Sequence, residues 1–345
     1  MKVATIVGAR PQFIKAATVS RAIRARGGLE ETMIHTGQHF DAAMSDIFFE
    51  ELDIPLPERN LAIQSGGHGQ MTGRMLEALE HALIELQPQL VMVYGDTNST
   101  LAGALAAAKL HIPIAHVEAG LRSFNRRMPE EINRVVTDHV ASLHFCPTRT
   151  AVANLAREGV IENVFHAGDV MYDATLYAIA RADRSTILAR LGLEQGGYAV
   201  ATVHRAESTD DPAAMRAIFS YLAKAAGERP VVLPLHPRTR KALDQAGLVP
   251  DGIILTEPLG YLDLQALLAG SELVLTDSGG VQKEAYFHRK PCITLRSETE
   301  WVETVENGWN RLWNGPDFAS PRRDIADYGD GRAADAIVAK IAEFG

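Results

Sequence analysis

Short apolar runs alternate with longer stretches of helix-forming residues along most of the chain. In the first half, the runs that predict strands are 2–7, 31–35, 90–94, 114–117, 144–146 and 163–167, and the stretches that predict helices include 12–26, 71–86 and 98–110. Nearly continuous apolar strands separated by helices are typical of βαβ units, whose strands form a parallel sheet covered on both faces. The first half therefore predicts one parallel α/β sheet.

The second half repeats this pattern, with predicted strands at 198–203, 231–235, 253–256, 273–276 and 292–295. Residues 168–193 join the two halves, and residues 331–344 have the pattern of an Ala-rich amphipathic helix that could pack on either half. A length of 345 residues fits two domains, because single cores stop growing at roughly 250 to 300 residues. We predict an α/β fold with two similar sheets.

The composition excludes some classes of function. A formal net charge of −9 disfavours nucleic acid as a partner, because its phosphates require clustered Lys and Arg. Cys146 and Cys292 lie in apolar runs without the spacing of a metal site, so we expect inert core thiols. We find no signal peptide and no apolar run near the ~20 residues that span a bilayer. We therefore expect a cytoplasmic protein without a membrane partner.

Acidic and basic residues gather at the ends of predicted strands between residues 94 and 134. They are Asp96, Glu118, Glu130, Glu131, Arg122 and Arg134. The carboxyl ends of parallel strands are where open α/β sheets carry out chemistry, since the strand ends are rigid and the crevice beyond them admits a ligand. These residues are therefore candidates for acid and base chemistry.

Ordinary structural roles could explain single members of this group. Asp96 or Asn98 could cap the following helix, and Glu130 with Glu131 could complement a helix dipole. Glu118 directly follows an apolar run, where a carboxylate either pairs with a cation or has a raised pKa. Because capping does not explain four carboxylates in one region, we predict a catalytic or ligand-binding role for at least two of Asp96, Glu118 and Glu130.

The first strand ends in GARPQFIK, which places Arg10 and Lys15 at the start of a helix. Helix N-termini attract anions, so both residues could face a phosphate; a solvated βα turn is the alternative. The chain has neither a Walker A loop nor a GxGxxG fingerprint here, which disfavours a tightly held dinucleotide. The next loop, HTGQHFD, lacks common zinc spacing, so we expect polar side chains that line a cleft and no metal site.

Three loops of the second half carry polar residues after predicted strands. They contain His204 and Arg205, then His236, then Ser278, Gly279 and Gly280 followed by Glu284. The two histidines follow consecutive strands and so point to one crevice, although a lone histidine there is often structural. Small residues that open a helix let backbone amides approach a diphosphate, and Glu284 could accept hydrogen bonds from ribose hydroxyls.

Taken in order, these motifs resemble one family. GARPQFIK, HTGQH, YGDTNST, HVEAGLRS, PEEINR, HRAES, LPLHPR and TDSGGVQKEA are similar to the motifs of the non-hydrolysing UDP-N-acetylglucosamine 2-epimerases, from residue 5 to about residue 310. The resemblance implies a glycosyltransferase-B-like fold: two Rossmann-like domains, residues 1–170 and 171–330, face each other across a nucleotide-sugar cleft, and a helix in 331–345 returns to the first domain. It also implies a homodimer that binds a UDP-sugar and needs no cofactor.

The family reaction inverts C2 of the sugar between the gluco and manno configurations. The resemblance implies elimination of UDP, which gives a 2-acetamidoglucal, and then addition of UDP with the proton on the other face. Such chemistry needs acid and base groups and groups that hold the departing anion. By matching motifs, the implied catalytic residues are Asp96, Glu118, Glu130 and His204. The implied substrate-binding residues are Arg10, Lys15, Arg134, His236, Ser278, Gly279, Gly280 and Glu284.

Two segments depart from the family pattern. FDAAMSD follows HTGQH, unlike the MLDQ-type sequence of members with a second, activating nucleotide-sugar site, so we do not expect that regulation. TEWVE replaces the usual TERPE and resembles the branch that acts on UDP-2,3-diacetamido-2,3-dideoxy-glucuronic acid. Arg296, Thr299, Glu300 and Trp301 could therefore read the substrate around the sugar ring, or form a structural loop with a packed Trp.

The sequence also leaves other functions open. A hydrolysing member of the family would release UDP and free N-acetylmannosamine. The same fold could serve a glycosyltransferase that needs an acceptor, or a catalytically silent sensor of nucleotide sugars. The complete acidic set argues against a sensor.

Overall fold

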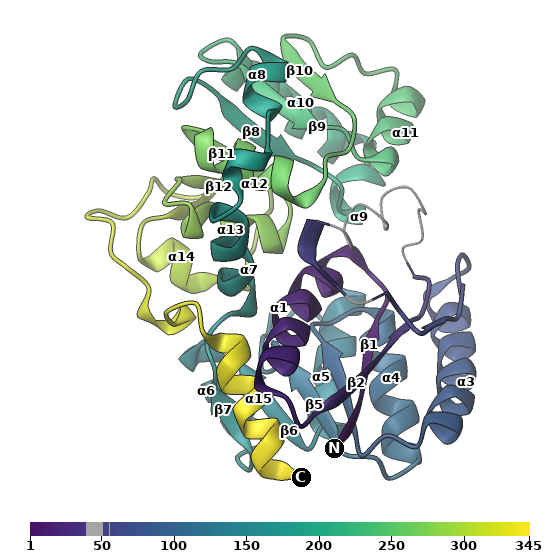
Figure 1. Ribbon diagram of the computed structural model, residues 1–345. Coiled ribbons are helices and arrows are strands. Elements are labelled where there is room, and N and C mark those ends of the chain that lie inside the picture. Colours follow the sequence, from purple (N-terminus) through teal and green to yellow (C-terminus); the bar gives the residue numbers. More distant parts are fainter. Residues whose placement is uncertain (39–50, 55) are drawn as a thin grey trace. The chain divides into compact units, whose positions relative to one another are not determined.

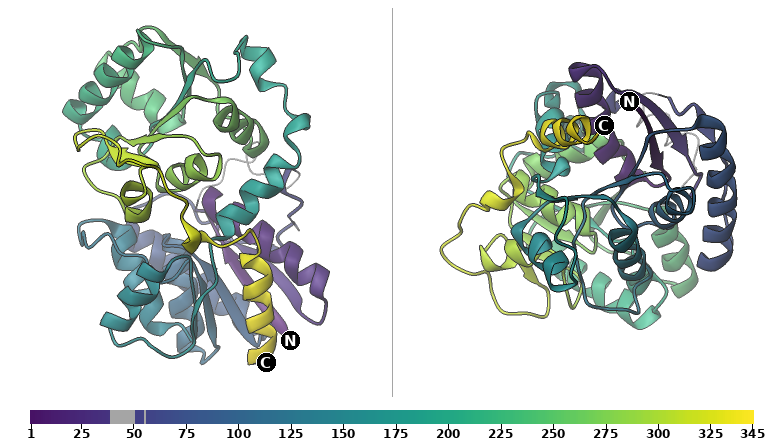
Figure 2. Two further views of the ribbon diagram at one scale, coloured as in Figure 1. Left: turned by 90° about the vertical axis from the view of Figure 1, so that its left-hand side faces the viewer. Right: turned by 90° about the horizontal axis from the view of Figure 1, so that it is seen from below.

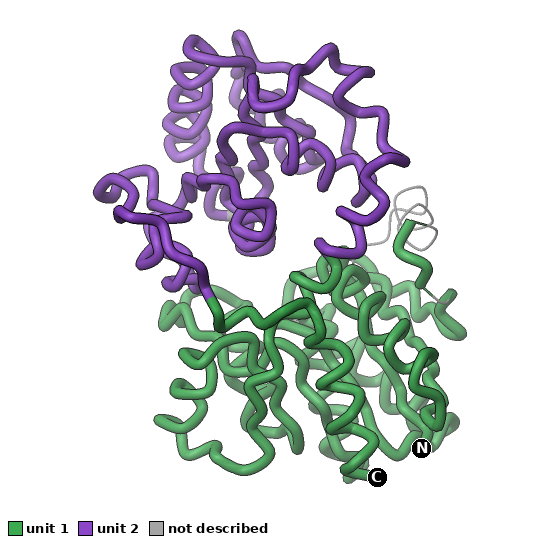
Figure 3. Tube along the Cα trace, turned by 60° about the vertical axis from the view of Figure 1, so that its left-hand side comes forward, with its two compact units in different colours: residues 1–174, 326–345 green, residues 175–325 purple. Residues whose placement is uncertain are grey.

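The computed structural model describes residues 1–38, 51–54 and 56–345. Within these ranges the chain forms two compact units, which Figure 3 distinguishes. Unit 1 comprises residues 1–174 and 326–345, and unit 2 comprises residues 175–325. No helix in the described part of the chain is long and apolar enough to span a membrane.

In its described residues, unit 1 contains a seven-stranded parallel sheet with the strand order β3-β2-β1-β4-β5-β6-β7 (Figure 1). The strands are β1 (Lys2–Val7), β2 (Glu30–His35), β3 (Arg59–Asn60), β4 (Leu90–Tyr94), β5 (Ile114–Val117), β6 (Leu143–Cys146) and β7 (Val164–His166). The helices are α1 (Arg10–Arg26), α3 (His68–Leu86), α4 (Asn98–Lys109), α5 (Pro129–Val140), α6 (Arg149–Arg157), α7 (Val170–Ile179), which runs on into unit 2, and α15 (Ala333–Phe344). The predicted elements are confirmed; the edge strand β3 is too short to give a sequence pattern.

Helices cover both faces of this sheet. On one face α3, α4 and α5 lie side by side, and α1 packs with α15 on the other (Figures 1 and 2). Ile6 and Val93 of neighbouring strands pack against Met75 and Leu79 of α3 in one apolar core. This burial fixes the sheet and therefore the positions of the loops at its carboxyl edge.

In its described residues, unit 2 contains a six-stranded parallel sheet with the order β10-β9-β8-β11-β12-β13. The strands are β8 (Ala199–Thr202), β9 (Val231–Pro234), β10 (Ile253–Thr256), β11 (Leu273–Thr276), β12 (Cys292–Thr294) and β13 (Asn310–Leu312). The helices are α8 (Ile187–Leu191), α9 (Ala206–Thr209), α10 (Pro212–Ala226), α11 (Pro237–Ala246), α12 (Tyr261–Gly270), α13 (Gly279–Phe287) and α14 (Val302–Glu306). The five predicted strands are confirmed, and β13 extends the sheet beyond them.

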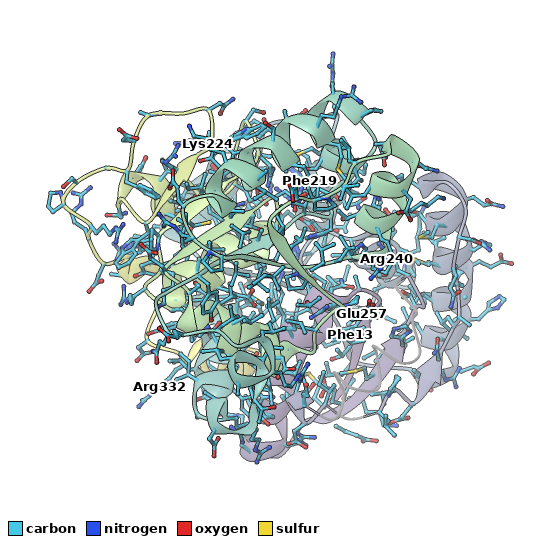
Figure 4. The ribbon with its side chains drawn as sticks, turned by 90° about the horizontal axis from the view of Figure 1, so that it is seen from above. Phe13, Phe219, Lys224, Arg240, Glu257 and Arg332 are labelled. Atoms are coloured by element: carbon cyan, nitrogen blue, oxygen red, sulfur yellow. The ribbon has the colours of Figure 1, made fainter. Side chains whose placement is uncertain are left out.

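Alternate strand residues of unit 2 face two separate cores. Ala199 and Ala201 of β8 pack with α10 and α11, whereas Val200 between them packs with α8, α12 and α13. Phe219 of α10 is buried and Lys224 of the same helix is exposed, which shows the amphipathic character of this covering layer (Figure 4). Both units thus have the layered Rossmann-like architecture that the resemblance implied.

Each sheet reverses its strand order at one place, between β1 and β4 in unit 1 and between β8 and β11 in unit 2. In open α/β sheets, ligands bind beyond the carboxyl ends of the strands at such a switch point. The loops after these four strands are residues 8–9, 95–97, 203–205 and 277–278. They belong to the sequence motifs GARPQFIK, YGDTNST, HRAES and TDSGG, so the motifs lie where a ligand is expected.

The chain returns to unit 1 through α15, as the resemblance implied, and this helix runs along α1 (Figure 2). Ala333 and Ala334, at its start, donate their backbone amides to the carboxylate of Asp173 in α7, at 3.2 and 2.8 Å. A carboxylate at a helix N-terminus satisfies amides that lack partners within the helix and complements the helix dipole. Asp173 therefore holds the start of the returning helix.

Asp173 should make stability depend on pH. Burial raises its pKa to about 6, although the two amides oppose this shift. Between about pH 4 and about pH 6 the native state then keeps a proton that the unfolded chain releases, so stability falls as the pH rises and is constant above this window. Relative to Asp173→Asn, the wild type should lose on the order of 1 to 3 kcal/mol of unfolding free energy across the window.

The measurement is the free energy of unfolding by urea at several pH values. Asp183→Asn is the control, because Asp183 is an exposed aspartate and is not among the groups that shift the pKa of Asp173. Its pH profile should follow that of the wild type. An Asp173→Asn profile parallel to the wild type would show that Asp173 is not the titrating group.

Candidate active site

The loops after β4 and β5 bend sharply at the strand ends. Gly95 has a φ of +62° and Glu118 has a φ of +72°, both in the left-handed region. A Cβ atom on Gly95 would lie 3.1 Å from Glu118 Oε2 and 3.2 Å from Lys15 Nζ. The absence of a side chain at Gly95 therefore lets Glu118 and Lys15 lie directly against the end of β4.

Lys15 and Glu118 form an ion pair in which the two side chains are only 10% and 9% exposed. The sequence predicts that a carboxylate at this strand end either pairs with a cation or has a raised pKa, and pairing is what the structure shows. The ammonium of Lys15, expected to face a phosphate, is engaged by Glu118, so its phosphate contact stays a prediction. Arg10, the other predicted anion-binding residue, is the half-buried first residue of α1.

Asp96 is held by two neighbouring side chains of α5. Its carboxylate pairs with the buried guanidinium of Arg134, and Asn133 Nδ2 donates to its backbone carbonyl at 2.9 Å. Arg134 also lies 3.2 Å from Glu131 Oε2. The Asp96 side chain remains 31% exposed. It is therefore a fixed carboxylate that a ligand can reach.

The alternative role of Asp96 or Asn98 as a helix cap is not the one that the structure shows. The N-cap of α4 is neither Asp96 nor Asn98 but Thr97, whose hydroxyl accepts a hydrogen bond from the Thr100 amide. Threonine is a good N-cap because its short side chain reaches that amide. Because Thr97 caps the helix, the Asp96 carboxylate is available to pair with Arg134.

The adjacent glutamates at the start of α5 have different surroundings. Glu131 is buried and accepts hydrogen bonds from the backbone amides of Ser123 and Phe124, both at 2.9 Å, so it shapes the preceding loop. Glu130 lies half-exposed in the first turn of the helix. Of the two, Glu130 is the more accessible, and its catalytic role stays a prediction.

A buried network lies below the carboxylates. His116 Nδ1 is 2.7 Å from Asp138 Oδ1, and His116 Nε2 is 2.8 Å from the carbonyl oxygen of Gly95. Arg122 donates to Asp138 Oδ2 at 2.6 Å and forms a bidentate pair with Glu158 at 2.7 and 2.8 Å. Burial alone would raise the pKa of Asp138, but His116 and Arg122 outweigh it and lower that pKa.

Sequence analysis missed three residues that hold this region together: His116, Asp138 and Gln12. Gln12 accepts from the Gly8 and Ala9 amides at 2.8 and 3.1 Å and donates to the Tyr94 carbonyl at 2.8 Å. It therefore joins the loop after β1 to the end of β4, across the switch point. Its only sequence signal is its place inside the GARPQFIK motif.

In unit 2, the buried carboxylate of Asp277 organises the loop after β8. It accepts the backbone amides of His204 and Arg205, both at 2.9 Å, and its Oδ1 lies 3.5 Å from His204 Nδ1. The His204 side chain is 40% exposed, and its ring centroid lies 5.6 Å from that of His236. The predicted meeting of the two histidines is confirmed.

His236 also caps α11 by accepting the Arg238 amide at 3.2 Å. In the same helix, Arg240 pairs with Glu257, after β10, at 2.8 Å (Figure 4). This exposed pair joins the loops after β9 and β10. It contributes at most about 1 kcal/mol, as exposed ion pairs do.

The start of α13 is tight on one side and open on the other. Ser278 is its N-cap. A Cβ on Gly279 would lie 2.5 Å from Glu300 Oε1, whereas a Cβ on Gly280 would meet only Ser278 Oγ, at 4.0 Å. The open side leaves the first amides of the helix within reach of an anion. Glu284 lies buried further along the same helix.

The TEWVE segment packs beside this helix start. Glu300 pairs with Arg296 at 3.0 Å and with Arg205 at 3.6 Å. Trp301 is buried, and the ammonium of Lys283 lies 3.8 Å from the centroid of a Trp301 ring. Of the two alternatives for Trp301, the packed side chain is the one that the structure shows.

The HTGQHFD loop is only partly described, because His39 and Asp41 lie outside the described residues. His35 is buried and stacks on Phe13 with ring centroids 5.0 Å apart, so it does not line a cleft as expected. Gln38 accepts a hydrogen bond from a backbone amide in the first turn of α4 at 3.1 Å. In the part of the chain that the structure describes, no three His, Cys, Asp or Glu residues are grouped as metal ligands.

Comparisons with known proteins identify the family of this chain. A family model described as UDP-N-acetylglucosamine 2-epimerase matches residues 21–342. A Pseudomonas aeruginosa protein named UDP-2,3-diacetamido-2,3-dideoxy-D-glucuronate 2-epimerase is 55% identical over 316 residues, which cover 90% of this chain and 88% of that protein. The UDP-N-acetylglucosamine 2-epimerase of Methanocaldococcus jannaschii is 44% identical over 323 residues, with 90% and 88% covered.

A crystal structure of the Methanocaldococcus jannaschii UDP-N-acetylglucosamine 2-epimerase, in complex with UDP-N-acetylglucosamine and UDP, has the same fold. It matches with a TM-score of 0.92 and 41% sequence identity, over 100% of both chains. The family model and both relatives cover most of the sequence. This chain therefore belongs to the UDP-N-acetylglucosamine 2-epimerase family.

Proposed function

We propose that this protein inverts C2 of a UDP-2-acetamido sugar without net hydrolysis, and that its preferred substrate is UDP-2,3-diacetamido-2,3-dideoxy-D-glucuronate. The observation that carries the proposal is the pair of fixed carboxylates in unit 1 of a member of this family: Asp96 after β4, at the switch point, and Glu118 after the neighbouring strand β5. Each is held by a cation that orients it.

The proposed reaction has two half-reactions. In the first, a base takes the C2 proton, the C1–O bond breaks with its electron pair leaving on UDP, and a C1–C2 double bond forms. In the second, UDP adds back to C1 and an acid delivers a proton to the opposite face of C2. The net change is inversion at C2, so UDP does not accumulate.

Unit 1 supplies the acid and base groups in this proposal. Asp96, Glu118 and Glu130 exchange protons and stabilise the positive charge that develops on the sugar ring. Lys15 and Arg134 keep the first two carboxylates in place, since an ion-paired carboxylate has fewer orientations than a solvated one. Arg10, at the start of α1, adds a positive charge for the substrate.

Unit 2 supplies the groups that hold UDP. In the proposal, the backbone amides at the start of α13 hold the diphosphate, and the exposed ring of His204 serves as an acid for the leaving group. The remaining UDP-binding residues in the proposal are His236, Ser278, Gly279, Gly280 and Glu284. A helix start suits this task because a departing diphosphate gains negative charge.

Two observations favour the diacetamido uronate as substrate. The relative that carries this name is 55% identical to the chain, against 44% for the UDP-N-acetylglucosamine enzyme of Methanocaldococcus jannaschii. The TEWVE segment resembles the same branch and lies beside the start of α13, where Glu300 Oε1 lies 2.5 Å from the position that a Cβ of Gly279 would take. UDP-N-acetylglucosamine is the second candidate, because a solved relative at 41% identity binds it.

We also infer a homodimer in the cytoplasm. The family resemblance supports the dimer, and the two free, buried thiols of Cys146 and Cys292 fit a reducing compartment. Light scattering on the purified protein should give twice the chain mass of 37.5 kDa. A mass of one chain would refute the dimer.

The activity itself is tested in deuterated water. If a UDP-sugar is a substrate, deuterium should appear at C2 of the recovered epimer. Free UDP, measured by chromatography, should stay far below the amount of sugar that is converted. Stoichiometric release of UDP would show a hydrolysing enzyme instead. Absence of exchange with both sugars would defeat the proposal.

Removal of each proposed acid or base should slow turnover. We expect Asp96→Asn, Glu118→Gln and Glu130→Gln each to lower kcat by at least about 10²-fold, the typical contribution of a positioned proton-transfer group. Glu162→Gln, at an exposed glutamate after α6, is the control and should keep the wild-type rate. Near-wild-type rates in all three variants would show that the assignments are wrong.

The substrate preference is tested by steady-state kinetics with both sugars. We expect kcat/KM for the diacetamido uronate to exceed that for UDP-N-acetylglucosamine by about 10²-fold or more, because a site built around extra polar substituents leaves its own groups unpaired when they are missing. Equal values, or a preference for UDP-N-acetylglucosamine, would select the second candidate.

A further inference from the structure

His116 is fully buried, yet both of its ring nitrogens meet acceptors. Nδ1 lies 2.7 Å from Asp138 Oδ1, and Nε2 lies 2.8 Å from the Gly95 carbonyl oxygen. A carboxylate and a carbonyl can only accept, so both hydrogen bonds form only when each nitrogen carries a proton. Asp138 compensates the resulting positive charge within the buried pair.

The hydrogen bond to Gly95 lies at the centre of the unit 1 site. The Gly95 carbonyl belongs to the peptide that leads directly into Asp96, and the Gly95 amide donates to the Val117 carbonyl at 3.0 Å, next to Glu118. The Lys15–Glu118 pair lies against Gly95 from another side, as the close approach to its Cβ position shows. The two peptide groups that flank the Gly95 Cα therefore fix the backbone next to both proposed carboxylates.

Asp138 extends the same support to the turn after Glu118. Its Oδ2 accepts the backbone amide of Gly120 at 3.1 Å as well as the Arg122 guanidinium at 2.6 Å. Gly120 has a φ of +79°, so this turn needs a glycine and a partner for its amide. A single buried carboxylate is thus connected to the loop after β4, through His116, and to the loop after β5 directly.

We propose that His116, oriented by Asp138, is a positioning residue for 2-epimerisation: it holds the Gly95 peptide so that Asp96 and Glu118 face the substrate. This inference rests on the proposed function. His116 does not touch the sugar; it acts through the backbone on which the two carboxylates are mounted. A displacement of about 1 Å at the reacting groups can cost about 10²-fold in rate.

His144 provides a matched control. It lies opposite His116 in the pairing of β5 with β6, is also buried, and also binds Asp138, through that residue's backbone carbonyl at 2.7 Å. It makes no contact with Gly95 among the hydrogen bonds of the described chain. A purely structural requirement for a buried histidine would make the two positions respond alike.

The kinetic test compares His116→Gln with His144→Gln, using deuterium exchange at C2. Glutamine carries both of its N–H donors on one nitrogen, so it cannot replace the two separate ring nitrogens of His116 that meet Asp138 and Gly95. We expect kcat to fall by about 10²-fold in His116→Gln with KM within about threefold of wild type, and both constants to stay within about threefold in His144→Gln. Equal losses in the two variants, or a loss confined to KM, would overturn the proposal.

A second measurement does not depend on activity. Amide hydrogen exchange of the peptide that contains Gly95 should be faster in His116→Gln and unchanged in His144→Gln, since the first variant alone releases the Gly95 peptide. Unchanged exchange in both variants would overturn the proposal even if kcat fell. If the wild type turned over neither UDP-sugar, the proposed function would fail, and the exchange experiment alone would decide whether His116 holds this peptide.

A third measurement applies to the wild type, should His116→Gln not fold. Solid-state NMR on protein labelled with ¹⁵N in histidine and with ¹³C in the glycine carbonyl should show one histidine with protons on both ring nitrogens and in contact with a glycine carbonyl. The hydrogen bond that this signal would report is the one from His116 Nε2 to the Gly95 carbonyl oxygen, at 2.8 Å. A neutral His116 ring, or no such contact, would overturn the proposal.

Discussion

A carboxylate that is buried from water must be satisfied by donors, and in this protein two such carboxylates determine the shape of the loops at the strand ends. Asp138 in unit 1 accepts hydrogen bonds from His116, Arg122 and the Gly120 amide. Asp277 in unit 2 accepts hydrogen bonds from the amides of His204 and Arg205. Leaving a charge of this kind unpaired costs several kcal/mol. The loops cannot move away from these positions without that cost, so the groups that they carry are held in place before any ligand binds.

The fold could be predicted from the sequence because it depends on long, repeated patterns. The apolar runs of strand length and the helical stretches between them require only local periodicity, and most of these elements are where the pattern places them. β3 and β13 are too short to produce such a pattern. The candidate residues at strand ends could be found for the same reason, since a charge that directly follows an apolar run is visible in the sequence.

Pairings between distant residues could not be predicted. The partner of Glu118 is Lys15, and the partner of His116 is Asp138, and in each case the sequence separation hides the contact. Thr97 caps α4 while the Asp96 carboxylate pairs with Arg134, and that pairing is again a tertiary contact. Local rules identify the residue types that can act, and tertiary packing decides which of them are used for structure.

The return of the chain to unit 1 has a consequence for the order of folding. Unit 2 is one continuous segment, residues 175–325, whereas unit 1 needs residues 326–345 to complete it. During synthesis domains fold as units, from the N-terminus onward. Synthesis of unit 1 therefore begins first and ends last, because α15, which packs against α1, follows the whole of unit 2 in the chain. The face of α1 that packs against α15 therefore stays uncovered until residues 326–345 have been synthesised.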